Sequence, residues 1–293
     1  MKKSIYIILS KWGYKIRNER KEKKRKLIFI EQFDVITNVD LIMRSYRYVC
    51  DILVSYPSLK ITDCNNGVLF IFSGLEIYVE TVEEIFIIDE VFVKMSYNFI
   101  SLDKIILIDV GANVGISSLF FSKQDNVVKI YAFEPIDDTF NQGRDNFKRN
   151  HTVSKVIKFL NIGLAYNDRE DVFMFNPNFK GNTGLRGELS PNFEKDLVTE
   201  KKVVLKDASV EIKKIIDANP NMKIVLKMDC EGAEYEIFDN INQSGIINDI
   251  DYLLIEWHDK GAKDLENILQ QNGFSFFSQN SSNNAGMIYA FKK

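Results

Sequence analysis

Residues 105–118 read IILIDVGANVGISS, and this stretch decides the fold. Its first four residues are all apolar, as in a strand that is buried on both faces of a parallel sheet. Asp109 ends the apolar run, Gly111 and Gly115 frame a tight turn, and an apolar segment suited to a helix follows. A strand, a glycine turn and a helix in this order begin the nucleotide-binding half of a doubly wound α/β sheet.

The spacing of the two glycines narrows the choice of ligand. The pattern G-x-x-x-G differs from the G-x-G-x-x-G of dinucleotide enzymes, and no Lys-Ser or Lys-Thr follows it as in a P-loop. A carboxylate beside the turn suits a ligand ammonium group, and free amides at a helix start suit a ligand carboxylate. S-adenosylmethionine carries both groups. An ordinary turn in an unrelated α/β protein is the alternative interpretation.

Composition and charge exclude several classes of protein. Two histidines exclude a His-rich zinc or iron site, and three cysteines without metal spacing favour a reducing cytoplasm. No apolar run is long enough to span a bilayer. Residues 1–26 hold eleven Lys or Arg against two Glu, a net +9, while the rest of the chain carries −12. We therefore expect a cytoplasmic protein that does not bind nucleic acid, with a basic arm that is solvated or touches the inner membrane face peripherally.

The chain divides into three predicted parts. They are a basic arm at 1–26, an N-terminal α+β lid or platform at 27–100, and a cofactor-binding domain at 101–293. Within the last, residues 176–191 are rich in Asn, Gly and Ser. A loop of that length is usually functional or disordered, and we interpret it as a mobile flap over the acceptor site.

Glu134 ends the second strand, 127–133, and lies 23 residues after Gly111. This matches the offset of an acidic residue that accepts hydrogen bonds from ribose hydroxyls, with a helix N-cap as the alternative. The next strand ends at Asn161, which is the candidate amide for an adenine ring or a turn residue.

Two later strands also end in polar residues. Strand 224–228 ends at Asp229, and strand 252–255 leads into Glu256 and His258. If the strands are neighbours, these side chains meet at the edge where α/β sheets bind ligands. His258 is the candidate general base and Asp229 its orienter; the alternatives are Asp229 as base or as partner of the methionine ammonium group, and a structural His258. Mg²⁺ between Asp229 and Glu256 is less favoured, and no metal site is predicted.

The segments IDVGANVG, YAFEP, LKMDCEGAE and LLIEWH, with VLKDASVEIKKI before the third, resemble the FkbM family of S-adenosylmethionine-dependent methyltransferases. The resemblance covers residues 97–293. It implies a class I, Rossmann-like methyltransferase fold with a seven-stranded doubly wound sheet. It also implies O-methylation of a hydroxyl on a sugar, glycan or small natural product.

The resemblance carries over to individual residues. The methionine end of the cofactor would be held by Asp109, Gly111, Asn113 and Gly115, and the ribose by Glu134. Asp229 and Glu231 match the family signature Lys-x-Asp-x-Glu-Gly.

Two other functions stay open at this point. One is a methyltransferase of RNA or protein that docks through the basic arm, and the other is a non-catalytic protein that binds S-adenosylmethionine, because fold does not imply function. We expect a small-molecule or glycan acceptor as the partner, and no oligomeric state is predicted.

Overall fold

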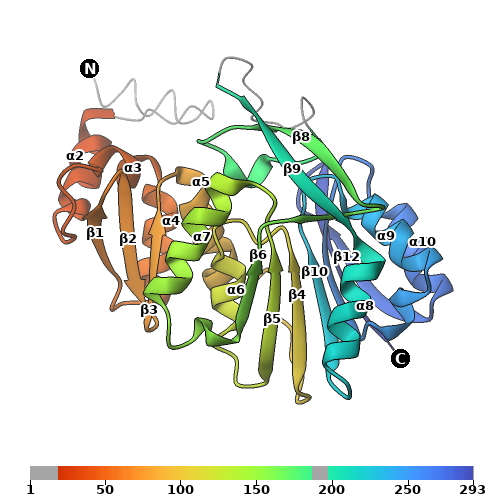
Figure 1. Ribbon diagram of the computed structural model, residues 1–293. Helices are drawn as coiled ribbons and strands as arrows, with labels where there is room; N and C mark the ends of the chain where they lie inside the picture. The colour runs from red at the N-terminus through yellow and green to blue at the C-terminus, as the bar shows by residue number, and fades with distance from the viewer. Residues whose placement is uncertain (1–18, 187–196, 293) are drawn as a thin grey trace, which may run out of the picture.

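A seven-stranded sheet forms the centre of the computed structural model, which describes residues 19–186 and 197–292. The strand order is β12-β13-β11-β10-β4-β5-β6 (Figure 1), and β13 alone runs antiparallel to its neighbours. The strands are β4 (Ile105–Val110), β5 (Val127–Phe133), β6 (Ile157–Leu160), β10 (Lys223–Met228), β11 (Tyr252–His258), β12 (Phe274–Asn280) and β13 (Ala285–Lys292). The predicted seven-stranded, doubly wound sheet is thereby confirmed.

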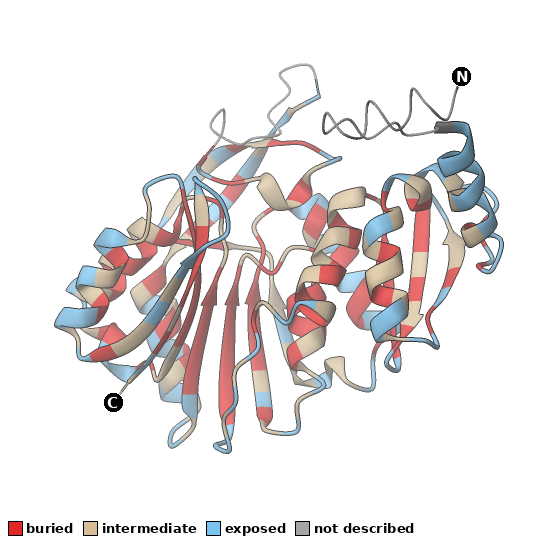
Figure 2. Cartoon of the chain, turned by 180° about the vertical axis from the view of Figure 1, so that it is seen from behind, coloured by how far each residue is buried: buried red, intermediate tan, exposed pale blue. Residues whose placement is uncertain are grey.

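The apolar run of β4 is explained by burial on both faces of the sheet (Figure 2). Ile105 and Leu107 belong to a core that includes side chains of α6 (Ile116–Phe121) and α7 (Asp137–Arg149). Ile106 and Ile108 belong to the opposite core. That core packs against α8 (Ala208–Ala218), α9 (Glu234–Gln243) and α10 (Lys263–Gln271).

The N-terminal region builds a smaller antiparallel sheet beside the large one (Figure 1). Its elements are α2 (Glu19–Ile30), α3 (Val39–Arg44), α4 (Tyr46–Ser55), β1 (Lys60–Cys64), β2 (Gly67–Phe72), β3 (Leu75–Val79), α5 (Val82–Ile88) and the π-helical turn η1 (Asp89–Val93). A capping box begins α5, with the side chains of Thr81 and Glu84 each accepting the other's backbone N–H. The apolar core of this region is continuous with the α6 side of the large sheet. The division at residues 26 and 100 stays a prediction.

A third sheet lies across the top of the molecule in Figure 1. It consists of β7 (Gly163–Ala165), β8 (Arg169–Phe175) and β9 (Thr199–Asp207), in the order β7-β9-β8. Short 3₁₀ turns occur at η2 (Ser154–Val156), η3 (Lys180–Asn182) and η5 (Ile246–Asp249). The predicted flap starts after β8, and its residues 187–191 lie outside the described part of the chain.

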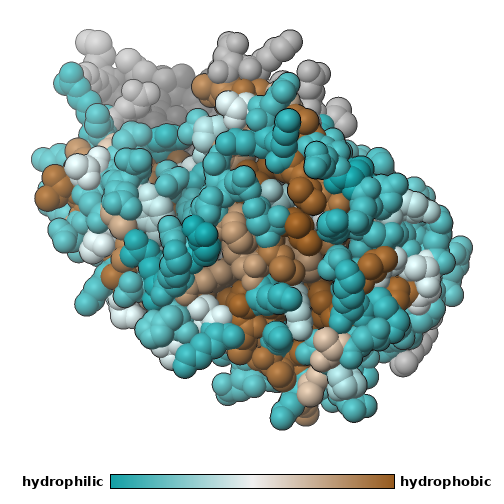
Figure 3. All heavy atoms as spheres, viewed as in Figure 1, coloured by the Kyte–Doolittle hydropathy of each residue, from teal (hydrophilic) through white to brown (hydrophobic). Residues whose placement is uncertain are grey.

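The surface in Figure 3 is mostly hydrophilic, and apolar residues gather along the middle of this face, over the strands of the large sheet. None of the helices described here combines the length and the apolar character that a bilayer crossing requires.

Candidate active site

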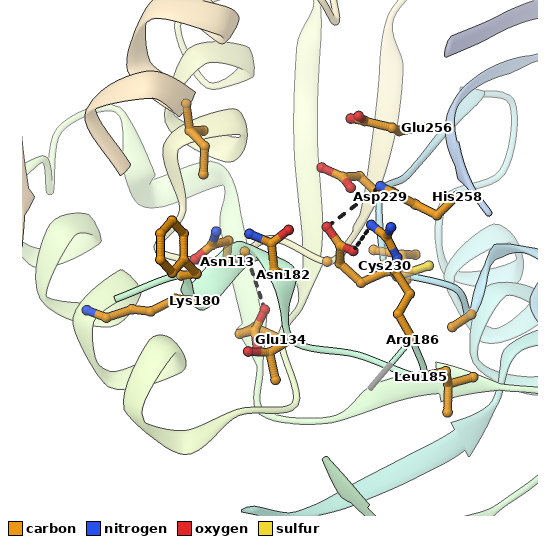
Figure 4. A pocket seen from close by; sticks show the side chains of 18 of the residues that line it. Asn113, Glu134, Lys180, Asn182, Leu185, Arg186, Asp229, Cys230, Glu256 and His258 are labelled. Atoms are coloured by element: carbon orange, nitrogen blue, oxygen red, sulfur yellow. Dashed lines mark hydrogen bonds and ion pairs between the residues drawn. The ribbon is translucent and has the colours of Figure 1, made fainter. Parts of the chain in front are cut away.

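A cavity of about 440 Å³ opens at the carboxyl edge of the large sheet. Its volume lies within the usual range for small-molecule sites. Of the predicted residues, those that line it are Gly111, Asn113, Glu134, Asp229, Glu256 and His258. Figure 4 shows Asn113 and Glu134 on one side of the cavity and Asp229, Glu256 and His258 on the other.

The glycine turn forms the floor between the two sides. Gly111 has φ +76°, and a Cβ atom there would lie 1.8 Å from the carbonyl oxygen of Asp229. Only glycine combines this conformation with so close an approach of backbone to backbone. Gly115, at φ +85°, begins α6, and a Cβ atom there would lie 2.5 Å from the ring of Phe147. Both glycines of the G-x-x-x-G pattern are thus required, because a side chain at either position would clash with a neighbouring group.

Asp109 differs from the prediction, because its carboxylate points away from the cavity. The residue is fully buried, and the hydroxyls of Ser117 and Ser118 each donate to its Oδ2 at 2.7 Å. Lys227 Nζ lies 3.1 Å from its Oδ1 and donates to the carbonyl of Gly111 at 2.9 Å. Asp109 therefore fixes the turn from behind, and the structure does not place it where it would hold a ligand ammonium group.

Glu134 lies in the cavity wall and is 7% exposed. Its carboxylate accepts the backbone N–H groups of Asn113 at 3.1 Å and Ile136 at 2.9 Å. Burial raises the pKa of Glu134 to about 7, although the two amides oppose this shift. Asn161 does not line the cavity; its side-chain amide donates to the carbonyls of Glu134 and Pro135 and so supports this turn. The contact of Asn161 with adenine stays a prediction.

The ends of β10 and β11 are neighbours, as predicted. Tyr97 Oη lies 2.8 Å from Asp229 Oδ2 and 3.2 Å from Glu256 Oε2, so one hydroxyl joins both carboxyl groups. Burial and the charge of Asp229 raise the pKa of Glu256 well above its usual range. Asp229 keeps 27% of its side chain exposed.

His258 is held by two carboxylates. Its Nδ1 lies 2.7 Å from Oε1 of Glu234, and its Nε2 lies 3.6 Å from Oε1 of Glu231. Burial lowers the pKa of His258, but the hydrogen bond to Glu234 and the charge of Glu231 outweigh burial and raise it to about 10. The imidazole is therefore protonated at neutral pH. In this state His258 cannot accept a proton, so the structure does not support its predicted role as general base.

Three further residues at or beside the cavity were given no role from the sequence. Arg186 pairs with Glu231 and Asp259 at 2.8 and 2.7 Å, Tyr97 bridges two carboxyl groups, and Lys227 supports the glycine turn. Lys227 carried a usable signal, since a charged residue inside the apolar run IVLKM is unusual. Arg186 lies in an irregular loop and Tyr97 just after a helix, where no periodicity marks them.

The sequence also matches known proteins. A family model described as the methyltransferase FkbM domain matches residues 109–276. The chain belongs to the FkbM methyltransferase family. It is therefore a methyltransferase, and the family implies S-adenosylmethionine as its cofactor.

Several relatives can be compared over part of their length. Methyltransferase sdnD of Sordaria araneosa is 25% identical over 218 residues, which are 67% of this chain and 84% of that protein. Methyltransferase 1 of Beauveria bassiana is 30% identical over 164 residues, 52% of this chain and 65% of that protein. A crystal structure of methyltransferase FkbM from Methylobacillus flagellatus aligns with a TM-score of 0.44 and 12% identity, over 85% of this chain and 60% of that one.

The residues around the cavity fit this cofactor. The carboxylate of Glu134 can accept hydrogen bonds from two ribose hydroxyls. Gly111 has no side chain, so its backbone packs closely against the carbonyl of Asp229 and leaves room for a ligand beside the turn. Apolar side chains for an aromatic base line the adjoining wall, namely Pro135, Leu164, Phe173 and Leu205.

Proposed function

We propose that this FkbM methyltransferase transfers the methyl group to a hydroxyl of a small natural product or a sugar. One observation carries the proposal: a single cavity is lined by Glu134, the candidate ribose contact, and by the polar cluster of Asp229, Glu231, Glu256 and His258. Figure 4 shows Glu134 across the cavity from Asp229, Glu256 and His258. A cofactor at the first end and an acceptor at the second would meet between them.

The bound cofactor supplies an electrophilic methyl group on a sulfonium, which an oxygen attacks in line. The chain positions the acceptor and excludes water, and such positioning supplies much of the rate enhancement of a two-substrate reaction. Asp229 is the group that takes the proton of the hydroxyl, because its carboxylate is partly exposed in the cavity while His258 is already protonated. This is the alternative in which Asp229 is the base.

The size of the cavity, about 440 Å³, supports a small acceptor. A further relative, AMB antimetabolite synthetase AmbE of Pseudomonas aeruginosa, is 27% identical over 119 residues, 39% of this chain and 5% of that protein. The name of that protein refers to the synthesis of an antimetabolite.

A transfer assay with methyl-labelled S-adenosylmethionine tests the proposal. We expect label in the small-molecule fraction when hydroxylated natural products and sugars are offered, and none in RNA or protein. Asp229→Asn should lower kcat by about 100-fold or more, the usual contribution of a general base. Label in RNA or protein would contradict the proposed acceptor class.

A further inference from the structure

Three side chains at the acidic end of the cavity present ligand atoms to one point. They are Asp229, Glu231 and His258, and one ligand atom from each lies within 4.8 Å of the other two. Within residues 19–186 and 197–292, this is the one group of three His, Cys, Asp or Glu residues that meets this spacing. One bound cation can bridge atoms at such distances after a small closure.

The imidazole of His258 is fixed in the orientation that ligation needs. Its Nδ1 lies 2.7 Å from Glu234, whose carboxylate is fully buried and also accepts the backbone N–H groups of Cys230 and Gly232. The side chain of His258 is only 4% exposed, yet its Nε2 faces the cavity with no hydrogen bond among the described residues. A carboxylate behind the far nitrogen of a histidine is the usual support of a metal-bound imidazole.

The carboxylate of Glu231 is oriented as well. Arg186 binds its Oε2 at 2.8 Å, and this leaves Oε1 turned toward Nε2 of His258 at 3.6 Å. Figure 4 shows Arg186, Asp229 and His258 converging there from three segments of the chain. The ligand atoms are thus held by other groups before any ion arrives.

From this geometry we propose that a divalent transition-metal ion binds to Asp229, Glu231 and His258. One imidazole nitrogen with two carboxylates suits Mn²⁺ or Zn²⁺, whereas Mg²⁺ and Ca²⁺ prefer oxygen ligands alone. The ion replaces the proton on Nε2, because a histidine ligand must be deprotonated. Three protein ligands leave at least one position open for another molecule.

The role of the ion in catalysis rests on the proposed function, whereas the site itself does not. A bound ion would hold the acceptor hydroxyl at its open position and lower the pKa of that hydroxyl, so that the carboxylate oxygen of Asp229 that does not bind the ion could take the proton. The oxygen then forms the new C–O bond to the methyl group while the C–S bond breaks. S-adenosylhomocysteine leaves with the electron pair of that bond.

Binding of Mn²⁺ to the full chain, followed by the loss of the free-ion signal in electron paramagnetic resonance, tests the site. We expect one Mn²⁺ per chain in the wild type and in the control His151→Ala, which changes the other, exposed histidine. Glu231→Gln and His258→Ala should each weaken binding by about tenfold or more, the effect expected for loss of a ligand. Circular dichroism reports the folding of each variant, and His258→Gln replaces His258→Ala if the latter does not fold.

Two outcomes would overturn the inference: no binding of Mn²⁺ or Zn²⁺ by the folded wild type at about 1 mM, or equal binding by the folded ligand variants. Titration of the same samples with S-adenosylmethionine separates this result from the proposed function. A wild type that binds the cofactor but no ion contradicts only the metal site. A wild type that binds the ion but not the cofactor contradicts the proposed function and supports the site.

Discussion

Glu134 shows how one side chain can serve both the fold and a ligand. Its two carboxylate oxygens accept hydrogen bonds from the backbone N–H groups of Asn113 and Ile136. Each oxygen keeps a further lone pair, and the residue lines the cavity. Only the ionised form can accept hydrogen bonds from two ribose hydroxyls. The charge state of this residue should therefore control the affinity for the cofactor.

The pKa of Glu134, about 7, determines in which direction pH changes the affinity for the cofactor. At pH 8 Glu134 is mostly ionised and at pH 6 mostly protonated, so the Kd for S-adenosylmethionine should be about tenfold higher at pH 6 than at pH 8. Isothermal titration calorimetry at the two pH values measures this ratio. Glu134→Gln should bind weakly with no such ratio, and an equal pH dependence in this variant would assign the effect to another group.

At Gly111 the backbone conformation and the close backbone contact with Asp229 together require glycine. Gly111→Ala would place a methyl group 1.8 Å from the Asp229 carbonyl and force an L-residue to φ +76°. We expect the free energy of unfolding to fall by about 3 kcal/mol or more, measured by urea denaturation. Gly261→Ala is the matched control, since its φ is +79° but nothing lies within 4 Å, and it should cost only about 1 kcal/mol. Equal losses would mean that the contact with Asp229 is unimportant.

At the scale of elements, the segment 179–186 forms a wall of the cavity and is held near both ends, at Lys180 and at Arg186. Lys180 contacts Glu80 at 2.6 Å and Glu84 at 3.1 Å in the N-terminal region, and Arg186 pairs with Glu231 and Asp259. Residues from three parts of the sequence are thereby joined over the site. The mobility predicted for the longer stretch 176–191 stays a prediction.

Removal of Arg186 should release one end of this wall. Loss of one partner from a buried ion pair costs a few kcal/mol, so Arg186→Ala should open the segment more often than the wild type. We expect proteolysis within residues 176–186 to be about tenfold faster or more, followed by mass spectrometry of the fragments. Lys206→Ala, which removes a pair with Asp168 on the surface, should leave the rate unchanged. The same rate in both variants would contradict this role.

Asp63 ties β1 to the start of α3. Its carboxylate accepts backbone N–H groups of Ile36, Thr37 and Asn38. Slight burial raises the pKa of Asp63, but these amides and the side chain of Asn38 lower it far more, to well below the ordinary value. A depressed pKa contributes stability above the unfolded-state pKa near 4, and that contribution is lost as the pH falls below it.

Asp63→Asn should therefore lower the free energy of unfolding by about 1–2 kcal/mol at pH 7, since the amides are partly exposed. The difference from the wild type should shrink toward pH 3, as denaturant titrations at several pH values would show. Asp40→Asn, at an exposed pair with Arg44, serves as the control and should have little effect. A difference that is constant with pH would contradict the ionic explanation.

At the scale of the whole molecule, the charge of the chain is divided unequally. Residues 1–26 carry +9 and the rest −12, and helix α2 presents exposed Lys23 and Lys24. We propose that this basic segment holds the enzyme at the anionic inner face of a membrane. Lys23→Glu with Lys24→Glu should weaken co-sedimentation with anionic vesicles by about tenfold, while Lys213→Glu with Lys214→Glu on α8 should not. Equal effects of the two pairs would show that only net charge matters.

The sequence predicted the sheet because its constraints are local. Buried parallel strands need continuous apolar runs, and the turn after β4 needs glycine. Both features can therefore be recognised within a short stretch of consecutive residues. The neighbouring positions of Asp229 and Glu256 followed from the fold class alone. The same logic correctly put Glu134 at the cavity.

The errors concern which way a side chain points and what surrounds it. Asp109 and Asn161 follow strands at the ligand edge, but buried partners turn both into supports of the turns. The charge on His258 depends on Glu234, four residues beyond Cys230 on another element, and no pattern around His258 reveals it. Such contacts between distant segments are set by tertiary packing, which a single sequence does not display.

Calorimetric titration of the full chain with S-adenosylmethionine at pH 8, beside Glu134→Ala, tests the central claim most directly. The account predicts binding of one molecule per chain in the wild type. It also predicts about 10- to 100-fold weaker binding in the variant, the value expected for charged hydrogen bonds to the ribose. Absence of binding by the folded wild type would contradict the claim, and equal binding by Glu134→Ala would contradict the placement of the cofactor.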